Sequence, residues 1–459
     1  MKILFASAEV DPFSKVGGLA DVAAALPQRL REIGHDVQVV TPCHASALPA
    51  FQAARSRRSL SISFPGEPRD VEIATVSGAG GVPVHLIRDP RVFDRGNIYG
   101  EPDDLARYQS LCRVILEMLK REEWKPDILH LNDWHTAPCA FALRSLSWTN
   151  PGLRGIASVF TIHNLRYRGP DEFNDFLAQA IYYSDMVTTV SPTYAHEVLT
   201  QEFGEGLESL LSLRSNSFAG ILNGLNTELF NPRTDPSIAH QFDLTSIDER
   251  HLNRVALRAE LGLPATDGPL AAMVTRLTEQ KGVDLVIQAL PELIAADAQL
   301  VVLGDGDQWL KADLARLEAS HPGRVRLAPR FDERLAQRIY AGSDIFLMPS
   351  RYEPCGLGQL IAMRYGSVPI GRRTGGLTDS IFDLDEHPDS PTGFLFDEFS
   401  SPGFAGAFER AALAFRDPAT WRKLQVAGMS HDFSWNASAK HYADIYVAAL
   451  RSRGIVPLE

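Results

Sequence analysis

The chain alternates short apolar runs with helix-like patterns, and this alternation is the feature that most constrains its fold. Runs of strand length lie at residues 3–6, 37–40, 128–131, 157–162, 186–190 and 220–222, and a helical pattern spans residues 18–33. Parallel strands have such apolar sequences because helices cover both faces of their sheet. The first half of the chain is therefore predicted to form a parallel sheet between two helical layers.

A second series of the same kind follows. Its predicted strands are residues 270–274, 299–303, 325–328, 344–348 and 368–370, and helical patterns span residues 283–295 and 333–341. A chain of 459 residues is longer than one hydrophobic core usually supports. Turn residues around a charged stretch separate the two series between residues 231 and 268. We predict two doubly wound domains, residues 1–240 and 241–435, with a C-terminal helix in residues 436–459 that joins the first domain.

The overall charge argues against two classes of partner. The 45 Lys and Arg residues against 57 Asp and Glu residues give a net charge of −12, so a basic face for nucleic acid or an anionic membrane is not expected. The apolar run at the N-terminus is too short for a secretory signal, and no apolar stretch has the length of a membrane span. The four cysteines are scattered without C-x-x-C spacing, which is typical of a reducing compartment. We expect a cytoplasmic protein.

Two segments repeat a pattern of a cation, a glycine pair and a helix-like run. They are KVGGLAD at residues 15–21 and RTGGLTD at residues 373–379. A glycine pair lets an anion approach backbone amides, and the helix that follows adds unpaired N–H groups and the positive end of its dipole. Two such segments predict a diphosphate held between two lobes. Two ordinary helices that start with glycine are the alternative interpretation.

Polar residues concentrate in the loops that follow the predicted strands, where open α/β sheets bind ligands. In the first domain these loops contain SAEVDPFSKVGG at residues 7–18, NDWH at 132–135 and HN at 163–164. In the second domain they contain TRLTEQKG at residues 275–282, GDGD at 304–307 and PSRYEPCG at 349–356. We therefore expect the functional residues at these strand ends.

Three residues of the second domain suggest chemistry on a charged leaving group. Arg276 and Lys281 lie on one loop, and fixed cations there would stabilise a departing diphosphate. A solvated basic loop is the alternative. Glu353 lies just before a predicted helix, where it would either cap that helix or contact a sugar hydroxyl or the positive charge at an anomeric carbon.

Side chains of the first domain suggest polyol recognition. Asp133, His135, His163 and Asn223 lie on successive loops, and carbohydrate hydroxyls need many fixed donors and acceptors. For any single histidine a structural role is the alternative. The GDGD segment weakly suggests a metal site, but a turn explains it as well. The cations and helix ends already supply positive charge, so we expect no metal and no cofactor.

Taken together, these motifs resemble those of the bacterial glycogen synthases and plant starch synthases. That family has a K-x-G-G-L-x-D loop, a D-W-H segment, a T-x-H-N strand end, an R-L-x-x-Q-K-G loop, P-S-R-[FY]-E-P-C-G-L-x-Q-L and R-T-G-G-L. The chain shows all of them in order over residues 1 to about 380. The resemblance implies the GT-B fold, in which two Rossmann-like domains face each other across a cleft.

The resemblance also implies an activity: retaining transfer of glucose from ADP-glucose to the non-reducing end of an α-1,4-glucan such as glycogen. A front-face mechanism, in which the leaving phosphate deprotonates the acceptor, is a hypothesis for it. The implied catalytic residues are Glu353, Arg276, Lys281 and His163. The implied donor-binding residues are Lys15, Gly17, Gly18, Asn223, Phe331, Tyr352, Thr374, Gly375 and Gly376. Asp133 and His135 would shape the acceptor side.

The sequence departs from the family pattern at two positions and leaves alternatives open. Asn226 stands where an aspartate is usual, and Thr275 where a serine is common. One alternative is a related retaining enzyme that makes maltose 1-phosphate, but such enzymes carry a second glutamate where this chain has Ile361. A nucleotide-sugar epimerase and a catalytically silent glucan-binding protein are the others. The silent protein would be expected to lose Lys15, Glu353 or Arg276.

Overall fold

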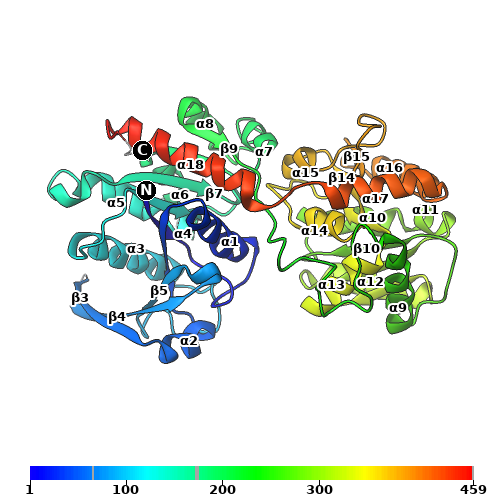
Figure 1. Ribbon diagram of the computed structural model, residues 1–459, viewed down its shortest axis with the longest axis horizontal. Helices are drawn as coiled ribbons and strands as arrows, with labels where there is room; N and C mark the ends of the chain where they lie inside the picture. Colours follow the sequence, from blue (N-terminus) through cyan, green and yellow to red (C-terminus); the bar gives the residue numbers. More distant parts are fainter. Residues whose placement is uncertain (65–66, 171–174, 457–459) are drawn as a thin grey trace. The chain divides into compact units, whose positions relative to one another are not determined.

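The computed structural model describes residues 1–64, 67–170 and 175–456, and the chain divides into two compact units (Figure 1). The first unit is Met1–Gly224 together with the segment that begins at Trp435, and the second is Leu225–Ser434. The division thus lies at residue 225 and not near 240. The reason is packing, because Leu225 and Ile238 are buried in the core of the second unit.

The first unit is built on one large sheet. Its strands are β1 (Lys2–Ala6), β2 (Asp36–Pro42), β3 (Ser56–Ser63), β4 (Pro68–Ser77), β5 (Pro83–Arg88), β6 (Ile128–Asn132), β7 (Ala157–Ile162), β8 (Met186–Thr189) and β9 (Phe218–Gly220). Its helices are α1 (Gly18–Glu32), α2 (Leu48–Ala53), α3 (Asp104–Arg121), α4 (Asp133–Thr136), α5 (Pro138–Leu146), α6 (Phe176–Tyr183), α7 (Pro192–Glu197), α8 (Glu208–Leu213) and α18 (Trp435–Ser452). The last strand ends at Gly220, whereas the sequence predicted it at residues 220–222.

The sheet of the first unit is mixed, which corrects the prediction of a purely parallel one. Within the described residues its strand order is β3-β4-β5-β2-β1-β6-β7-β8-β9, and β3–β4 and β4–β5 pair antiparallel. Antiparallel neighbours need only a tight connection and no crossover helix. β3 was missed because it is an edge strand with mostly exposed side chains, so it lacks the apolar run of a buried strand.

Helices cover both faces of this sheet. α1 and α18 pack on one face, and α3, α5 and α6 pack on the other. Figure 1 shows the C-terminal helix α18 beside α1. The sequence predicted that this helix joins the first domain. A buried hydrogen bond of 2.8 Å joins Tyr446 Oη of α18 to His130 Nδ1 of β6. The chain end is therefore part of the first unit's core.

The second unit has a smaller, fully parallel sheet. Its strands are β10 (Leu270–Val274), β11 (Gln299–Leu303), β12 (Val325–Ala328), β13 (Ile345–Met348), β14 (Val368–Arg372) and β15 (Phe394–Phe396). Its helices are α9 (His251–Leu261), α10 (Val283–Gln288), α11 (Leu290–Ala295), α12 (Gln308–Ser320), α13 (Glu333–Gly342), α14 (Gly358–Arg364), α15 (Gly375–Ser380), α16 (Ser401–Phe415) and α17 (Pro418–Ser430). The single helix predicted at residues 283–295 is two helices, because Pro291 opens a new one.

The strand order of each unit indicates where ligands bind. The second sheet has the order β12-β11-β10-β13-β14-β15, and the parallel part of the first has the same pattern around β1 and β6. The order reverses between β1 and β6 and between β10 and β13, and open α/β sheets bind ligands at such switch points, beyond the carboxyl ends of the strands. The motif loops at residues 7–17, 275–282 and 349–357 directly follow β1, β10 and β13. Among the helices of the described ranges, none combines the length and the apolar character that a membrane crossing requires.

Candidate active site

The loop after β1 is organised around a buried carboxylate. Glu9 is 2% exposed, and its Oε2 accepts hydrogen bonds from the backbone N–H of Val16 at 2.5 Å and of Gly17 at 3.3 Å. Gly18 begins helix α1. Two amides of the first glycine motif are thus already bound to an internal anion. The prediction that this motif binds an external phosphate therefore depends on Lys15 and on the N–H groups at the start of α1.

The cations of the two glycine motifs both have carboxylate partners. Lys15 Nζ lies 2.6 Å from Asp21 Oδ1, and Arg373 pairs with Glu386 at 2.6 Å and with Asp397 at 2.8 Å. The Lys15 side chain is 39% exposed, and such ion pairs contribute only about 0.2–1 kcal/mol. The pair with Asp21 is therefore weak enough for Lys15 to exchange it for a phosphate.

The second glycine pair lets two loops approach each other. A Cβ on Gly375 would lie 2.0 Å from the carbonyl oxygen of Glu353, and a Cβ on Gly376 would lie 2.0 Å from that of Cys355. Gly375 also has a positive φ of 43°, and the Gly376 N–H donates to the Glu353 carbonyl at 3.0 Å. The glycines are needed here for close packing of backbone on backbone. The loop that carries Glu353 is thereby fixed to the start of α15.

Glu353 is held by two side chains. Its carboxylate is buried, with Oε2 at 2.6 Å from Lys281 Nζ and accepting from the Ser350 hydroxyl at 2.9 Å. Arg276 on the same loop as Lys281 is exposed, and no residue of the described ranges makes an ion pair or hydrogen bond with its guanidinium. The loop after β10 thus offers one cation that orients a carboxylate and one that is directed to solvent.

Asp133 and His163 form a second cluster in the first unit. Asp133 has a positive φ of 53°, and its Oδ1 accepts from the backbone N–H of His163 at 2.7 Å. The amide of Asn132 donates to the Ala6 carbonyl at 2.9 Å, so its Oδ1 is the acceptor for His163 Nε2–H at 2.9 Å. Burial lowers the pKa of His163 to about 3 and raises that of Asp133 to about 7. His163 is therefore neutral, with Nδ1 as a hydrogen-bond acceptor.

His135 lies among aromatic rings and not on an open wall of the site. Its ring centroid is 4.2 Å from that of Trp134 and 4.6 Å from those of Tyr99 and Tyr108. Burial lowers its pKa well below the ordinary value. Its Nδ1 is buried without a hydrogen-bond partner in the described ranges, so the structure shows its packing and its role on the acceptor side stays a prediction.

Two of the predicted donor-binding side chains have buried polar atoms without a partner in the described ranges. They are Asn223 Oδ1 and Thr374 Oγ1. Buried polar atoms without a hydrogen bond are rare because they cost about 1–3 kcal/mol each. Both atoms are able to form a hydrogen bond with a ligand.

The remaining predicted residues differ in exposure. The ring of Phe331, in the loop after β12, is 66% exposed. Tyr352 is half-buried, and its carbonyl accepts from Gln280 at 3.4 Å. Asp305 pairs with Lys311 at 2.7 Å. Asn226 accepts with Oδ1 from the amides of Glu228 and Leu229 in the way an aspartate would, so this departure keeps the local turn.

Sequence reasoning missed Glu9, Asn132 and Tyr99. A signal for Glu9 existed, because it is the first acidic residue after a buried strand and lies in the same loop as the first glycine pair. Nothing in the sequence indicates that Asn132 bonds His163, since the two residues come from different strands. Tyr99 comes from a segment in which no motif was found.

Comparisons with known proteins find relatives over nearly the whole chain. Residues 2–213 match the family model described as starch synthase catalytic domain, and residues 268–412 match the one described as glycosyl transferases group 1. The chain is 40% identical to a glycogen synthase of Geotalea daltonii over 99% of this chain and 100% of that protein. It is 42% identical to one of Anaeromyxobacter dehalogenans over 97% of this chain and 99% of that protein.

The chain belongs to the glycogen synthase family. Members of this family are glycosyltransferases, and this one is a hexosyltransferase. The structure of this glycogen synthase family member is similar to the catalytic domain of starch synthase IV from Arabidopsis thaliana bound to ADP and acarbose. The TM-score is 0.88 at 37% identity, over 98% of this chain and 99% of that one. A sucrose-phosphate synthase from Thermosynechococcus elongatus, with a TM-score of 0.61 at 20% identity over 97% of this chain and 98% of that one, shares the GT-B fold.

Proposed function

We propose that this enzyme transfers glucose from ADP-glucose to the non-reducing end of an α-1,4-glucan and so elongates glycogen. The observation that carries the proposal is the loop after β10, where Arg276 is open to solvent and Lys281 holds the buried Glu353 beside the start of α15. Cations and a carboxylate at a topological switch point are suited to a reaction that releases a diphosphate from a sugar. The ADP in the similar starch synthase structure supports the choice of donor.

Both units carry residues that are suited to contacts with the donor. In the second unit Arg276 and Lys281 would neutralise the diphosphate, since the ammonium of Lys281 keeps two further N–H donors beside its bond to Glu353. Thr374 would use its unpartnered hydroxyl, and the exposed ring of Phe331 would stack on adenine. In the first unit Lys15 would contact the phosphates. Asn223 and the acceptor nitrogen of His163 would bind glucose hydroxyls.

The reaction breaks one bond, forms another and transfers one proton. The bond between the anomeric carbon and the β-phosphate oxygen breaks, and a bond forms from that carbon to the 4-hydroxyl oxygen of the glucan. The hydroxyl proton passes to the departing phosphate oxygen, so the configuration is retained without a protein nucleophile. The negative charge grows on the phosphate in the transition state, and for this reason the two cations act on turnover more than on binding.

The acceptor glucan would bind near the loop after β6. Asp133 remains a candidate because its carboxylate lies in the loop after β6 beside His163. His135 packs against Trp134 and Tyr99, and its buried Nδ1 would be available to an acceptor hydroxyl. We also retain the cytoplasm as the site of action, supported by four cysteines that are buried and free.

Formation of maltose 1-phosphate is the weaker candidate. Its second glutamate would occupy position 361, where this chain has an isoleucine that is buried in the core of the second unit. A carboxylate there would be costly without a partner. We therefore favour a polymeric glucan over a sugar phosphate as the acceptor.

The test is an ADP-release assay with ADP-glucose or UDP-glucose, with and without glycogen. We expect ADP release to depend on glycogen and UDP-glucose to be the poorer donor. Release at an equal rate without glycogen would indicate an epimerase or hydrolase and would contradict the proposal. A product that forms only when glucose 1-phosphate is added as the acceptor would favour the maltose 1-phosphate reaction.

A further inference from the structure

A buried carboxylate that the proposed reaction does not use lies directly behind Lys15. Glu9 accepts from the N–H groups of Val16 and Gly17 through a single oxygen, Oε2. These two residues follow Lys15 in the chain, so their position fixes where the Lys15 side chain starts. The Tyr99 hydroxyl favours the ionised form of the same carboxylate and so lowers its pKa.

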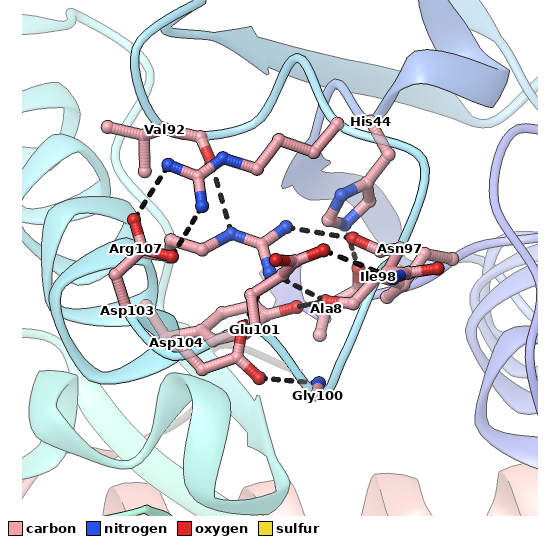
Figure 2. A network of polar contacts seen from close by, with 12 residues as sticks. Ala8, His44, Val92, Asn97, Ile98, Gly100, Glu101, Asp103, Asp104 and Arg107 are labelled. Atoms are coloured by element: carbon pink, nitrogen blue, oxygen red, sulfur yellow. Dashed lines mark hydrogen bonds and ion pairs between the residues drawn. The ribbon is translucent and has the colours of Figure 1, made fainter.

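The segment that carries Tyr99 is itself held from behind. Arg107 of α3 is 0% exposed, pairs with Asp104 at 2.5 Å, and donates to the carbonyls of Val92 at 3.0 Å, Asn97 at 3.1 Å and Ile98 at 3.2 Å. Figure 2 shows this guanidinium among those carbonyls, with Asp104 also accepting from the Gly100 N–H. Tyr99 lies between these anchored residues. Its contact with Glu9 is therefore built into the fold.

A cavity of about 370 Å³ lies in front of these two segments. Residues 12–16 line one side of it and residues 96–99 line the other, so Lys15 borders open space while Glu9 remains buried. The titratable groups that act on Glu9 are Asp21 of α1 and Tyr99 of the neighbouring segment, and Glu9 in turn acts on Tyr108 of α3 and Asp133 of α4. Lys15, which follows in the same loop and carries a positive charge, pairs with Asp21.

We propose that Glu9 is a positioning residue, whose ionised carboxylate holds the Val16 and Gly17 amides and thereby fixes Lys15 for the diphosphate of the donor. The inference rests on the proposed function, since the anion that Lys15 meets is ADP-glucose. Hydrogen bonds to an ionised acceptor are about twice as strong as neutral ones, so protonation of Glu9 loosens the loop. Glu9 does not touch the donor in this account.

The geometry has a consequence for pH dependence. Burial raises the pKa of Glu9 to about 7, and the bonds from Val16, Gly17 and Tyr99 oppose that rise. The ionised form therefore predominates above pH 7, and donor affinity falls as the pH drops from 8 to 6. The diphosphate of ADP-glucose is esterified at both ends and does not titrate in this range, unlike that of ADP.

The experiment measures the dissociation constant of ADP-glucose, without glucan, between pH 6 and 8 by titration calorimetry. We expect the wild type to bind about 3- to 10-fold more weakly at pH 6 than at pH 8. Glu9→Gln keeps the shape and one acceptor oxygen but has no charge, so it mimics the protonated form. Its affinity should be flat over this range and equal to that of the wild type at pH 6. The exposed Glu32→Gln, at the end of α1, is the matched control and should behave as the wild type.

A second variant provides a test that does not require Glu9→Gln to fold. Tyr99→Phe removes a bond that lowers the pKa of Glu9, so the midpoint of the pH profile should move upward. Asp133→Asn removes the other carboxyl group with a raised pKa. Its affinity for ADP-glucose should depend on pH as steeply as that of the wild type. If the affinity for ADP-glucose changes equally with pH in the wild type and in Glu9→Gln, the proposed role of Glu9 is wrong. Absence of ADP-glucose binding by the wild type at every pH would instead contradict the proposed function itself.

Discussion

At the scale of single residues, burial separates the two cations of the loop after β10. Lys281 neutralises the buried Glu353, so it stabilises the fold as well as the transition state. Arg276 is exposed, and without a partner among the described residues it can contribute to the fold very little. Lys281 therefore acts on both stability and turnover, whereas Arg276 acts on turnover alone.

We expect Arg276→Met to lower kcat by about 10²–10³-fold with little change in donor KM and in the free energy of unfolding. Lys281→Met should lower kcat similarly and also destabilise the protein by about 3 kcal/mol, because the Glu353 carboxylate stays buried without a cation. Steady-state kinetics and urea unfolding of both variants check this. Equal losses in kcat and donor affinity for Arg276→Met would contradict a role in the transition state.

At the scale of elements, the strand-end loops of the second unit are locked together through backbone contacts. Gly375 and Gly376 let the start of α15 touch the carbonyls of Glu353 and Cys355. These contacts join the segment after β13 to the segment after β14, and so place Glu353 relative to Thr374. Rigid support of this kind is what a preorganised site needs.

Gly376→Ala should separate the two loops, since its Cβ would lie 2.0 Å from the Cys355 carbonyl oxygen. We expect a loss of about 2–4 kcal/mol in the free energy of unfolding and a drop in kcat of about 100-fold or more. Unfolding in urea and the ADP-release assay measure the two effects.

Gly406→Ala is the matched control, because Gly406 lies inside α16 and a Cβ added there would have no other described atom within 4 Å beyond its own helix backbone and chain neighbours. It should raise the free energy of unfolding by about 0.5–1 kcal/mol through better helix propensity, and leave kcat unchanged. A Gly376→Ala enzyme as stable and as active as this control would refute the packing role of the second glycine pair.

At the scale of the whole molecule, the two units differ in how they respond to acid. Five described histidines of the first unit have a pKa that burial lowers far below 6.5. They are His44, His85, His130, His135 and His163. In the second unit the described histidine with a lowered pKa is His431, and its shift is smaller. The acid response should therefore be concentrated in the first unit.

The sign follows from proton uptake. Below pH 6.5 the unfolded chain binds protons that the folded first unit does not, so the histidines make stability fall as the pH falls. Glu9 and Asp133 act in the opposite direction between pH 7 and 4.5, because their raised pKa values let the folded unit take up protons first. The five histidines outweigh the two carboxyl groups, so the first unit takes up protons on unfolding and loses stability as the pH falls from 6 to 4.5.

Urea unfolding combined with limited proteolysis at pH 8, 6 and 5 measures this effect. We expect the first unit to unfold at a lower urea concentration at pH 5 than at pH 8, while the second unit changes less. A first unit whose stability is constant from pH 6.5 to 5 would contradict the burial of these histidines as neutral groups.

Much of the fold and part of the site could be predicted from the sequence. Strands β10, β11 and β12 have the predicted bounds because buried parallel strands are continuous apolar runs with turns at both ends. The positions of the motif loops followed from those strands. The exposed edge strand β3 and its antiparallel pairing had no such signal, since the pairing depends on its neighbours in the sheet.

The roles of the glycine pairs depend on partners that are distant in the sequence or set by loop closure. The sequence indicated amides open to an anion at both pairs, but Glu9 occupies those at Val16 and Gly17, and the segment 353–355 covers the pair at 375–376. His135 was taken for a polar group of the site because nothing in its own segment shows the three rings that surround it. Local patterns predict where a loop lies, and tertiary packing decides what its atoms contact.

The central claim is that this enzyme extends an α-1,4-glucan with glucose from ADP-glucose, with retention. The most direct measurement is ¹³C NMR of the product formed from ADP-glucose labelled in the glucose and a short maltooligosaccharide. The account predicts labelled glucose in an α-1,4 linkage at the non-reducing end. Label found as free glucose, in maltose 1-phosphate or in a β linkage would contradict it.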